Sequence, residues 1–245
     1  MHLNDLIKYC KILINELPEE DRLKVYLNGR ISKYSQDFFD FGYFPNLENL
    51  SKLTSLINEE ELIKLGIIDK KNTVGISKYY CPMFNYNLIM PYRDVYGDTV
   101  ALVGRTLLSD EERGSYPKYM NTVFDKGRHL FGLYQAKKSI IDNNCAIIVE
   151  GQFDCISAFD KGITNIVALG SSNMTADQFS LLLRYTDNLF LLLDNDEAGE
   201  SGRNRIKSKY GQYANIKDLH LPSGYKDIDE YLKDNGSELF DIVIN

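Results

Sequence analysis

Apolar residues recur with helical spacing in several segments of the first 141 residues, separated by one stretch of a different period. The helical pattern predicts helices at 3–17, 21–27, 59–65 and 130–141. Between the last two, the apolar runs 88–90 and 99–103 flank a polar stretch in which Gly97 is the natural turn residue. This segment is therefore predicted to be a β-hairpin.

From residue 146 onward, short apolar runs alternate with helical patterns. Strands are predicted at 146–149, 166–169, 189–193 and 216–221, and helices at 154–160, 175–185, 198–209 and 228–233. Strands with apolar interiors that alternate with helices indicate a parallel sheet covered on both faces. We expect an α/β protein, with an α+β N-terminal subdomain over residues 1–143 and a Rossmann-like domain with a parallel sheet over residues 144–245.

Acidic residues concentrate where the predicted C-terminal strands end or where the following helices begin. They are Glu150, Asp154, Asp194, Asp196, Asp227 and Asp229. In an open α/β sheet the functional groups lie at the carboxyl ends of strands, so these side chains are expected to gather. Carboxylates this close need cations, and hard oxygen ligands with no His or Cys nearby suit Mg²⁺ or Mn²⁺. A pair of such ions supports phosphoryl transfer.

Helix capping is an alternative role for some of these acids. Asp154, Asp196 and Asp227 precede or begin predicted helices, where a carboxylate favours the free N–H groups and the helix dipole. Capping offers no explanation for Glu150 and Asp194, which stand at the ends of apolar strands.

The chain is acidic overall, with a formal net charge of −7, which argues against nonspecific coating of nucleic acid. The segment 115–140 is the exception, because it holds five basic residues and one acid. Two neighbourhoods of opposite charge suggest that a polyanion is held on one side and cations on the other.

Cysteine usage and hydropathy exclude some classes of protein. The four cysteines form no C-x-x-C pair and the three histidines are scattered, so no zinc is expected and the thiols are predicted to be buried and reduced. The apolar runs are too short to span a membrane, and no export signal is visible, which predicts a cytoplasmic protein with no membrane partner.

Three acidic motifs resemble those of the TOPRIM domain, a fold shared by bacterial-type primases, topoisomerases and several nucleases. The motifs are Val149-Glu150-Gly151-x-x-Asp154, Asp194-x-Asp196-x-Ala198-Gly199 and Asp227-x-Asp229. Upstream motifs are similar, in the same order, to those of DnaG-type primases, and extend the resemblance over residues 25–235. They include Pro91-Tyr-Arg93-Asp94-x-x-Gly97, Gly104-Arg105, Lys118-Tyr-Met-Asn121 and Lys126-Gly-Arg128-x-Leu-Phe-Gly-Leu133.

The resemblance implies a minimal primase core that makes short RNA primers on single-stranded DNA with Mg²⁺ or Mn²⁺. It implies that Glu150, Asp194 and Asp196 bind catalytic ions, with support from Asp154, Asp227 and Asp229. It implies a basic cleft for template and ribonucleoside triphosphates lined by Arg105, Lys118, Asn121, Lys126 and Arg128, of which Lys118 and Lys126 are also catalytic. No zinc ribbon or helicase-binding region is expected in this chain, so a replicative helicase or a separate zinc-module protein is a candidate partner.

Two other functions remain open at this point. A TOPRIM nuclease would use the same acids for hydrolysis, although the basic segment favours polymerisation because a hydrolase holds no nucleoside triphosphate. A non-catalytic primase-like replication module would be expected to lose some of the acids, and none of the principal ones is missing. A topoisomerase is disfavoured, since nothing resembles the separate domain that carries its tyrosine nucleophile. The basic residues have their own alternative, a solvated surface.

Overall fold

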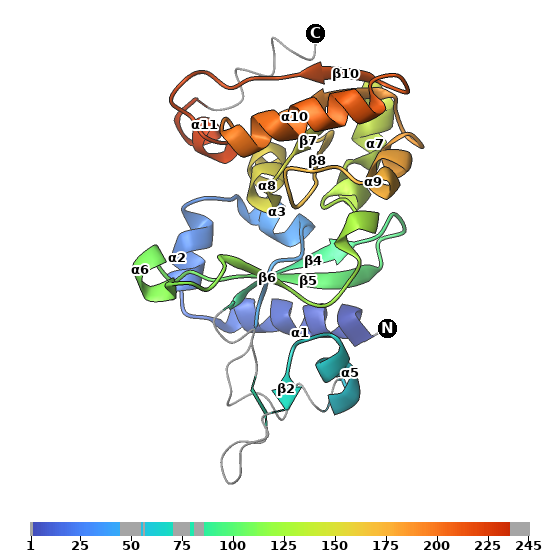
Figure 1. Ribbon diagram of the computed structural model, residues 1–245. Coiled ribbons are helices and arrows are strands. Elements are labelled where there is room, and N and C mark those ends of the chain that lie inside the picture. Colours follow the sequence, from blue (N-terminus) through green and yellow to red (C-terminus); the bar gives the residue numbers. More distant parts are fainter. Residues whose placement is uncertain (1, 45–54, 56, 71–78, 81–85, 236–245) are drawn as a thin grey trace. The chain divides into compact units, whose positions relative to one another are not determined.

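The computed structural model describes residues 2–44, 55, 57–70, 79–80 and 86–235 (Figure 1). The chain divides into two compact units. The first consists of Met1–Tyr92 and Asp98–Phe124, and the second of Arg93–Gly97 and Asp125–Asn245. Arg93–Gly97, at the turn of the hairpin predicted from the sequence, therefore belong to the second unit, although the residues on either side of them belong to the first.

The first unit is a small sheet packed against a long helix. Its helices are α1 (His2–Glu16), α2 (Arg22–Asn28), α3 (Lys33–Phe38), α5 (Glu59–Lys64) and α6 (Asp110–Arg113). Its main sheet has the order β1-β4-β5-β6, formed by β1 (Gly42–Tyr43), β4 (Leu88–Arg93), β5 (Thr99–Arg105) and β6 (Tyr119–Asn121). A separate antiparallel pair consists of β2 (Asp69–Lys70) and β3 (Tyr79–Tyr80).

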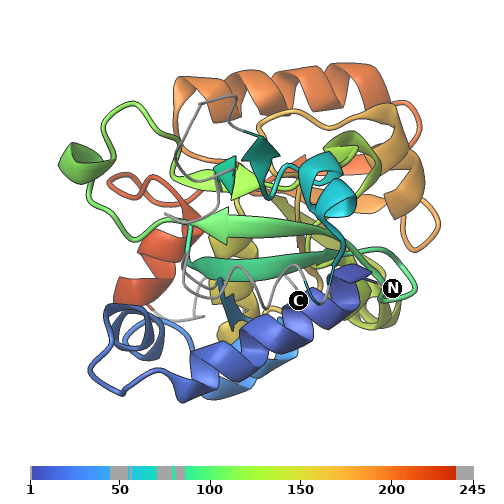
Figure 2. The same ribbon diagram turned by 90° about the horizontal axis from the view of Figure 1, so that it is seen from below.

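The core of this unit lies between α1 and the sheet. Figure 2 shows α1, in blue, running beside the strands of this sheet. Leu6 and Cys10 of α1 pack with Ile89 of β4 and Leu102 of β5, and all four are fully buried. The approach of α1 to β1 requires a glycine, because a Cβ on Gly42 would lie 2.5 Å from the Cβ of Cys10.

The second unit is built on a parallel sheet with the order β10-β9-β7-β8. Its strands are β7 (Ala146–Val149), β8 (Ile166–Ala168), β9 (Asn188–Leu191) and β10 (Asn215–Asp218). Its helices are α7 (Leu133–Asn143), α8 (Gln152–Asp160), α9 (Ala176–Leu182), α10 (Glu197–Tyr210) and α11 (Ile228–Asn235), with the 3-10 turn η3 (Lys126–Arg128) before them.

Helices cover both faces of this sheet. Alternate residues of β7, Ala146 and Ile148, belong to a buried cluster that also holds side chains of α7, α9 and α10. The intervening residues Ile147 and Val149 are equally buried and point to the other face, where α8 packs on β8 and α11. Apolar residues on both sides of the strand are thus the reason for the continuous apolar runs in the sequence.

The strand order creates a topological switch point between β7 and β9. From β7 the chain crosses to β8 on one side, and from β9 it continues to β10 on the other. In open parallel sheets the crevice at such a point, outside the carboxyl ends of the strands, is where ligands bind.

The sequence patterns agree with most of this architecture. The α/β class, the parallel sheet and its alternation with helices are confirmed, and β4 and β5 are hydrogen-bonded neighbours joined through Gly97, which has a φ of 98°. The sequence did not predict α3, α6, β1 or β6, because elements of two to six residues carry too few positions to show a period. Among the described residues, no helix is both long and apolar enough to cross a membrane.

The segment before β7 packs with the second unit. Phe131 exchanges two backbone hydrogen bonds with Ala168 of β8, at 3.0 and 2.9 Å. Residues 125–143 thus belong to the compact unit that contains the parallel sheet, whereas the domain boundary expected from the sequence lies after residue 143. The division into two domains at residues 143 and 144 stays a prediction. Of the cysteines, Cys10, Cys145 and Cys155 are buried free thiols, and Cys81 lies outside the described residues.

Candidate metal centre and basic residues

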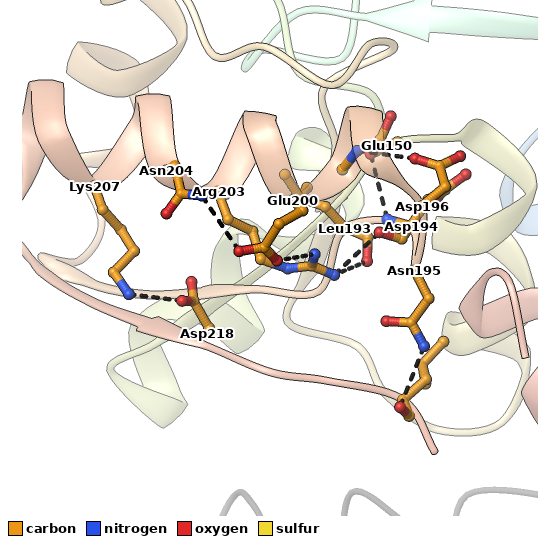
Figure 3. Close-up of polar contacts among 12 residues, drawn as sticks. Glu150, Leu193, Asp194, Asn195, Asp196, Glu200, Arg203, Asn204, Lys207 and Asp218 are labelled. Carbon is orange, nitrogen blue, oxygen red and sulfur yellow. Dashed lines mark hydrogen bonds and ion pairs between the residues drawn. The ribbon is translucent and has the colours of Figure 1, made fainter. Parts of the chain in front are cut away.

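Two carboxylates flank the switch point of the parallel sheet. Glu150 directly follows β7, and Asp194 follows β9 after two further buried residues. The main-chain N–H of Asp194 donates a hydrogen bond of 3.3 Å to Oε1 of Glu150 (Figure 3). The two strand ends are therefore joined through one of the acids that the sequence singles out.

Three further acids bind backbone N–H groups at helix starts. Asp154 accepts a hydrogen bond from Gly151 (2.9 Å), Asp196 from Gly199 (2.9 Å) and Asp227 from Glu230 (2.8 Å). The capping role proposed as an alternative thus exists for each. Each of these bonds uses one carboxylate oxygen, and the second oxygen of each side chain can still accept from a donor or bind a cation.

Burial and mutual repulsion raise the pKa of several of these acids. Burial, followed by the neighbouring Asp194, raises the pKa of Glu150 to about 7. Burial and Asp227 raise the pKa of Asp194 to about 6, and the same two causes hold the pKa of Asp154 well above its ordinary value. Carboxyl groups with raised pKa values are hard to ionise at neutral pH. A divalent cation bound among them would stabilise their ionised form.

The carboxylate oxygens of these acids are suitable ligands for a hard cation, although the side chains do not converge on one position. Among the described residues, no three His, Cys, Asp or Glu side chains converge closely enough to share a metal ion. The ammonium of Lys226 lies instead near two of the acids, 3.8 Å from Oδ2 of Asp194 and 3.9 Å from Oδ2 of Asp196. Carboxylate oxygens with no thiolate or imidazole among them match Mg²⁺ or Mn²⁺.

Asp229 differs from the other five acids. It lies on α11, is buried, and both of its oxygens have partners: Ser157 of α8 donates to Oδ1 (2.5 Å), and Lys233 donates to Oδ2 (2.9 Å). The carboxylate therefore links two packed helices. Its expected support of the metal site stays a prediction.

The residue between the two aspartates of the second motif holds the neighbouring loop in place. The side-chain amide of Asn195 donates to the carbonyls of Leu221 (3.2 Å) and Tyr225 (3.1 Å). Its main-chain N–H donates to the carbonyl of Lys226 (2.7 Å). Because the loop leads into Asp227, this clamp brings the third acidic motif to the second.

A buried arginine lies behind the same strand end. Arg203 of α10 is 2% exposed, and its Nη2 donates to the main-chain carbonyls of Leu193 and Asp194, the latter at 3.1 Å (Figure 3). Its Nη1 contacts Glu200 at 3.2 Å. The guanidinium thus binds the main chain of a candidate metal ligand.

Two of the expected basic residues belong to the unit that carries the acids. The ammonium of Lys126 donates to the carbonyl of Gly170 (2.8 Å), and the N–H of Gly170 donates to the carbonyl of Glu150 (2.8 Å). Lys126 is therefore tied through one residue to the end of β7. Arg128 is exposed and pairs with Asp177 at 3.5 Å and Asp125 at 4.0 Å.

The other three belong to the first unit, where β5 and β6 pair. Lys118 is exposed immediately before β6, and Asn121 ends that strand. Arg105 lies opposite Tyr119 in the register, donates to its hydroxyl (3.0 Å) and stacks on the ring of Tyr26, 5.0 Å from its centroid. With only 5% of its surface exposed, Arg105 is a packed residue that orders its aromatic neighbours.

Sequence reasoning missed Lys226, Asn195 and Arg203. A signal existed for Arg203, because Gly199, Arg203, Ile206 and Tyr210 recur with helical spacing and all are buried, which places an arginine on the apolar face of α10. No sequence signal distinguishes Lys226 or Asn195 from ordinary loop residues.

Comparison with known proteins decides the family. The model of the DNA primase catalytic core, N-terminal domain, matches residues 11–137, just over half of the chain, and the Toprim-like model matches residues 147–232. The chain belongs to the DNA primase catalytic-core family. The resemblance drawn from the acidic and upstream motifs is thereby confirmed.

Curated relatives of this primase-family chain are DNA primases from several bacteria. Those of Aquifex aeolicus and Clostridium acetobutylicum are each 34% identical, over 84% and 89% of this chain, and that of Escherichia coli K12 is 32% identical over 75%. The matched region covers 41%, 36% and 31% of these relatives, so the chain spans about two-fifths of their length or less.

Solved primase structures share the fold. The zinc-binding and RNA polymerase domains of the Aquifex aeolicus primase match with a TM-score of 0.82 and 31% identity, covering 100% of this chain and 59% of that one. A DnaG primase catalytic domain bound to single-stranded DNA matches with a TM-score of 0.85 and 27% identity, covering 99% and 79%. The α+β unit followed by a Toprim-like unit is thus the architecture of primase catalytic cores.

Proposed function

We propose that this protein is a DNA primase core, which synthesises short RNA primers on single-stranded DNA by metal-dependent nucleotidyl transfer during replication. The observation that carries the proposal is the set of acids at the switch point of a Toprim-like sheet, in a chain whose first half matches the primase catalytic core. The reaction joins the 3′-hydroxyl of one nucleotide to the α-phosphate of the next and releases pyrophosphate.

In this proposal Glu150, Asp194 and Asp196 hold Mg²⁺ or Mn²⁺, Asp154 and Asp227 support them, and Asp229 supports them indirectly by linking α8 to α11. The bound ions supply activation of the attacking oxygen and stabilisation of charge on the leaving oxygens. The acids of this chain contribute by losing protons when the cation arrives, since the pKa values of Glu150 and Asp194 are raised in its absence.

Lys118, Asn121, Lys126 and Arg128 are proposed to bind the phosphates of template and ribonucleoside triphosphates, with Lys118 and Lys126 acting on the reacting nucleotide. Support comes from the exposure of Lys118 and from the tie between Lys126 and the end of β7. For Arg105 the burial of its side chain supports an indirect part, in which it holds Tyr119 beside Lys118.

The deciding experiment is primer synthesis on single-stranded DNA with labelled ribonucleotides and Mg²⁺ or Mn²⁺. We expect short labelled RNA from the wild type and none from the Asp194→Ala, Asp196→Ala double variant. Asp142→Asn is the matched control, because Asp142 is an exposed acid at the end of α7 that pairs with Lys138, and it should leave synthesis unchanged.

The same reaction without nucleotides tests the alternatives. Metal-dependent cleavage of DNA in place of synthesis would replace the proposal with a TOPRIM nuclease. DNA binding with neither synthesis nor cleavage would favour a non-catalytic replication module.

The lysines have a separate test. Lys118→Ala and Lys126→Ala should each raise the KM for ribonucleotides or lower kcat at least tenfold. Lys161→Ala, which changes an exposed lysine at the end of α8, should do neither.

The proposal also includes a replicative helicase or a separate zinc-module protein as partner, and residence in the cytoplasm.

A further inference from the structure

The guanidinium of Arg203 is enclosed in the second unit at the point where β9 leads into the acidic turn. Its side chain is 2% exposed, and Nη2 binds two consecutive main-chain carbonyls, those of Leu193 and Asp194. A buried charge is costly unless hydrogen bonds and opposite charges compensate it. The compensation here comes from the strand end and from Glu200.

The helix that carries Arg203 is pressed against the same turn. A Cβ on Gly199 would lie 2.1 Å from the carbonyl oxygen of Asp194, and Gly199 also donates its N–H to Asp196. Gly199 therefore packs closely on the main chain of Asp194 and binds the side chain of Asp196, while Arg203 binds the carbonyl of Asp194. Of these contacts, the one from Arg203 brings positive charge.

That charge acts on the acids as well as on the main chain. Arg203 lowers the pKa of both Glu150 and Asp194, against the larger raising effects of burial and neighbouring acids. Lys226 also pairs with Asp194, but it is 62% exposed and free to leave when a metal ion enters. Arg203 is buried and bonded to the main chain, so we expect it to stay in place when a metal ion binds.

We propose that Arg203 is a positioning residue for the metal centre: by binding the main chain of Leu193 and Asp194 it sets the direction of the Asp194 and Asp196 carboxylates before a divalent cation arrives. The inference rests on the proposed function in one respect, that these acids bind such a cation. Arg203 itself touches neither metal nor substrate. Residues that orient ligands in this way typically account for a 10–100-fold difference in metal affinity.

The test is Mn²⁺ binding to the full chain, followed by electron paramagnetic resonance of free Mn²⁺. Arg203→Met keeps an unbranched side chain but removes the donors and the charge, and we expect the Kd for Mn²⁺ to rise about tenfold or more. Arg203→Lys keeps the charge and a donor nitrogen, and we expect it to recover most of the affinity. Arg205→Met is the matched control, since Arg205 is exposed on the same helix, and it should not change Kd.

A folded Arg203→Met, verified by circular dichroism, with a Kd within twofold of the wild type would overturn the inference. If that variant does not fold, the wild type decides: the side-chain N–H resonance of Arg203 should shift on titration with Mg²⁺ and follow saturation, and an unmoved resonance overturns the inference. The Asp194→Ala, Asp196→Ala double variant in the same assay separates the two proposals. Unchanged Mn²⁺ binding by that variant would instead reject the metal site on which the proposed function depends.

Discussion

The N–H of Asp194 donates a hydrogen bond of 3.3 Å to the carboxylate of Glu150, and this contact joins the ends of the two strands that flank the switch point of the parallel sheet. Both side chains are acids with raised pKa values. The bond therefore holds together two groups that repel each other once both are ionised. A cation shared between the two carboxylates would offset this repulsion. Without the cation, the repulsion lowers the free energy of unfolding, which can be measured.

Replacing Glu150 should stabilise the metal-free protein at neutral and alkaline pH. The pKa of Glu150 is about 7 in the folded protein against an ordinary 4.5, so the folded state binds more protons and loses stability as pH rises between these values. Glu150→Gln keeps the acceptor for Asp194 and removes the charge. We expect the free energy of unfolding to rise by about 1–2 kcal/mol at pH 8, after allowance for partial exposure.

Urea unfolding in the presence of a chelator measures this effect. The gain should shrink toward pH 4.5, where Glu150 is protonated in the folded state and the penalty is absent. An equal effect at both pH values would contradict the assignment of the raised pKa.

Metal affinity should increase with pH between 6 and 8. Glu150 and Asp194, with pKa values of about 7 and about 6, must lose their protons before they can coordinate a cation. Each coupled proton changes the Kd by up to about tenfold per pH unit. Calorimetric titration with Mg²⁺ in two buffers of different ionisation enthalpy should show proton release near pH 6.5, and Glu150→Gln should reduce it. No buffer dependence would argue against binding at these acids.

Lys226 should compete with the metal ion. Its ammonium lies 3.8 and 3.9 Å from carboxylate oxygens of Asp194 and Asp196, where a divalent cation would carry more charge. Because the lysine is exposed, the competition is modest, and Lys226→Met should tighten Mn²⁺ binding about two- to fivefold. Lys161→Met serves as the control for loss of a surface charge. Weaker binding by Lys226→Met would show that the lysine assists the site and does not compete for it.

Gly199→Ala should destabilise the protein even though alanine is the better helix former. The new Cβ would lie 2.1 Å from the carbonyl oxygen of Asp194, a main-chain atom that cannot easily move. Against a helix-propensity gain of about 1 kcal/mol, we expect a net loss of about 1–3 kcal/mol in thermal or urea unfolding. Ser201→Ala, exposed on the same helix, should be neutral or slightly stabilising. A stabilised Gly199→Ala would mean that α10 can shift away from the turn.

Asp229 should matter for stability more than for metal. Removing its charge weakens the bonds to Ser157 and Lys233, and Asp229→Asn should lower the free energy of unfolding by about 1–3 kcal/mol. A double-mutant cycle with Ser157→Ala should give a coupling of at least 0.5 kcal/mol, as expected for contacting groups. The Mn²⁺ affinity of Asp229→Asn should stay within about threefold of the wild type. A much larger loss would restore Asp229 to the ligand set implied by the sequence motif.

The C-terminal sheet and its acids could be predicted because each rests on local information. Apolar runs such as Ala146–Val149 are buried on both faces, and that burial is visible in the sequence as the absence of polar positions. Glu150 and Asp194 follow such runs, so their place at the carboxyl edge of the sheet follows from strand direction alone. Arg105 is the opposite case. Its burial between Tyr26 and Tyr119 depends on residues far away in sequence, and nothing local separates it from an exposed basic residue.

The sequence by itself thus determined the α/β class, the parallel strands and which acids follow those strands, because periodicity and strand-end position are properties of short segments. Only the tertiary structure decided which partners those acids have. The strand order places β7 beside β9, which brings Asp194 to Glu150, and the packing of α10 and of the loop after β10 brings Arg203 and Lys226 to the same turn. The physical reason is that pKa values and ion pairs depend on distance and burial in space, which neighbouring positions in a sequence do not specify.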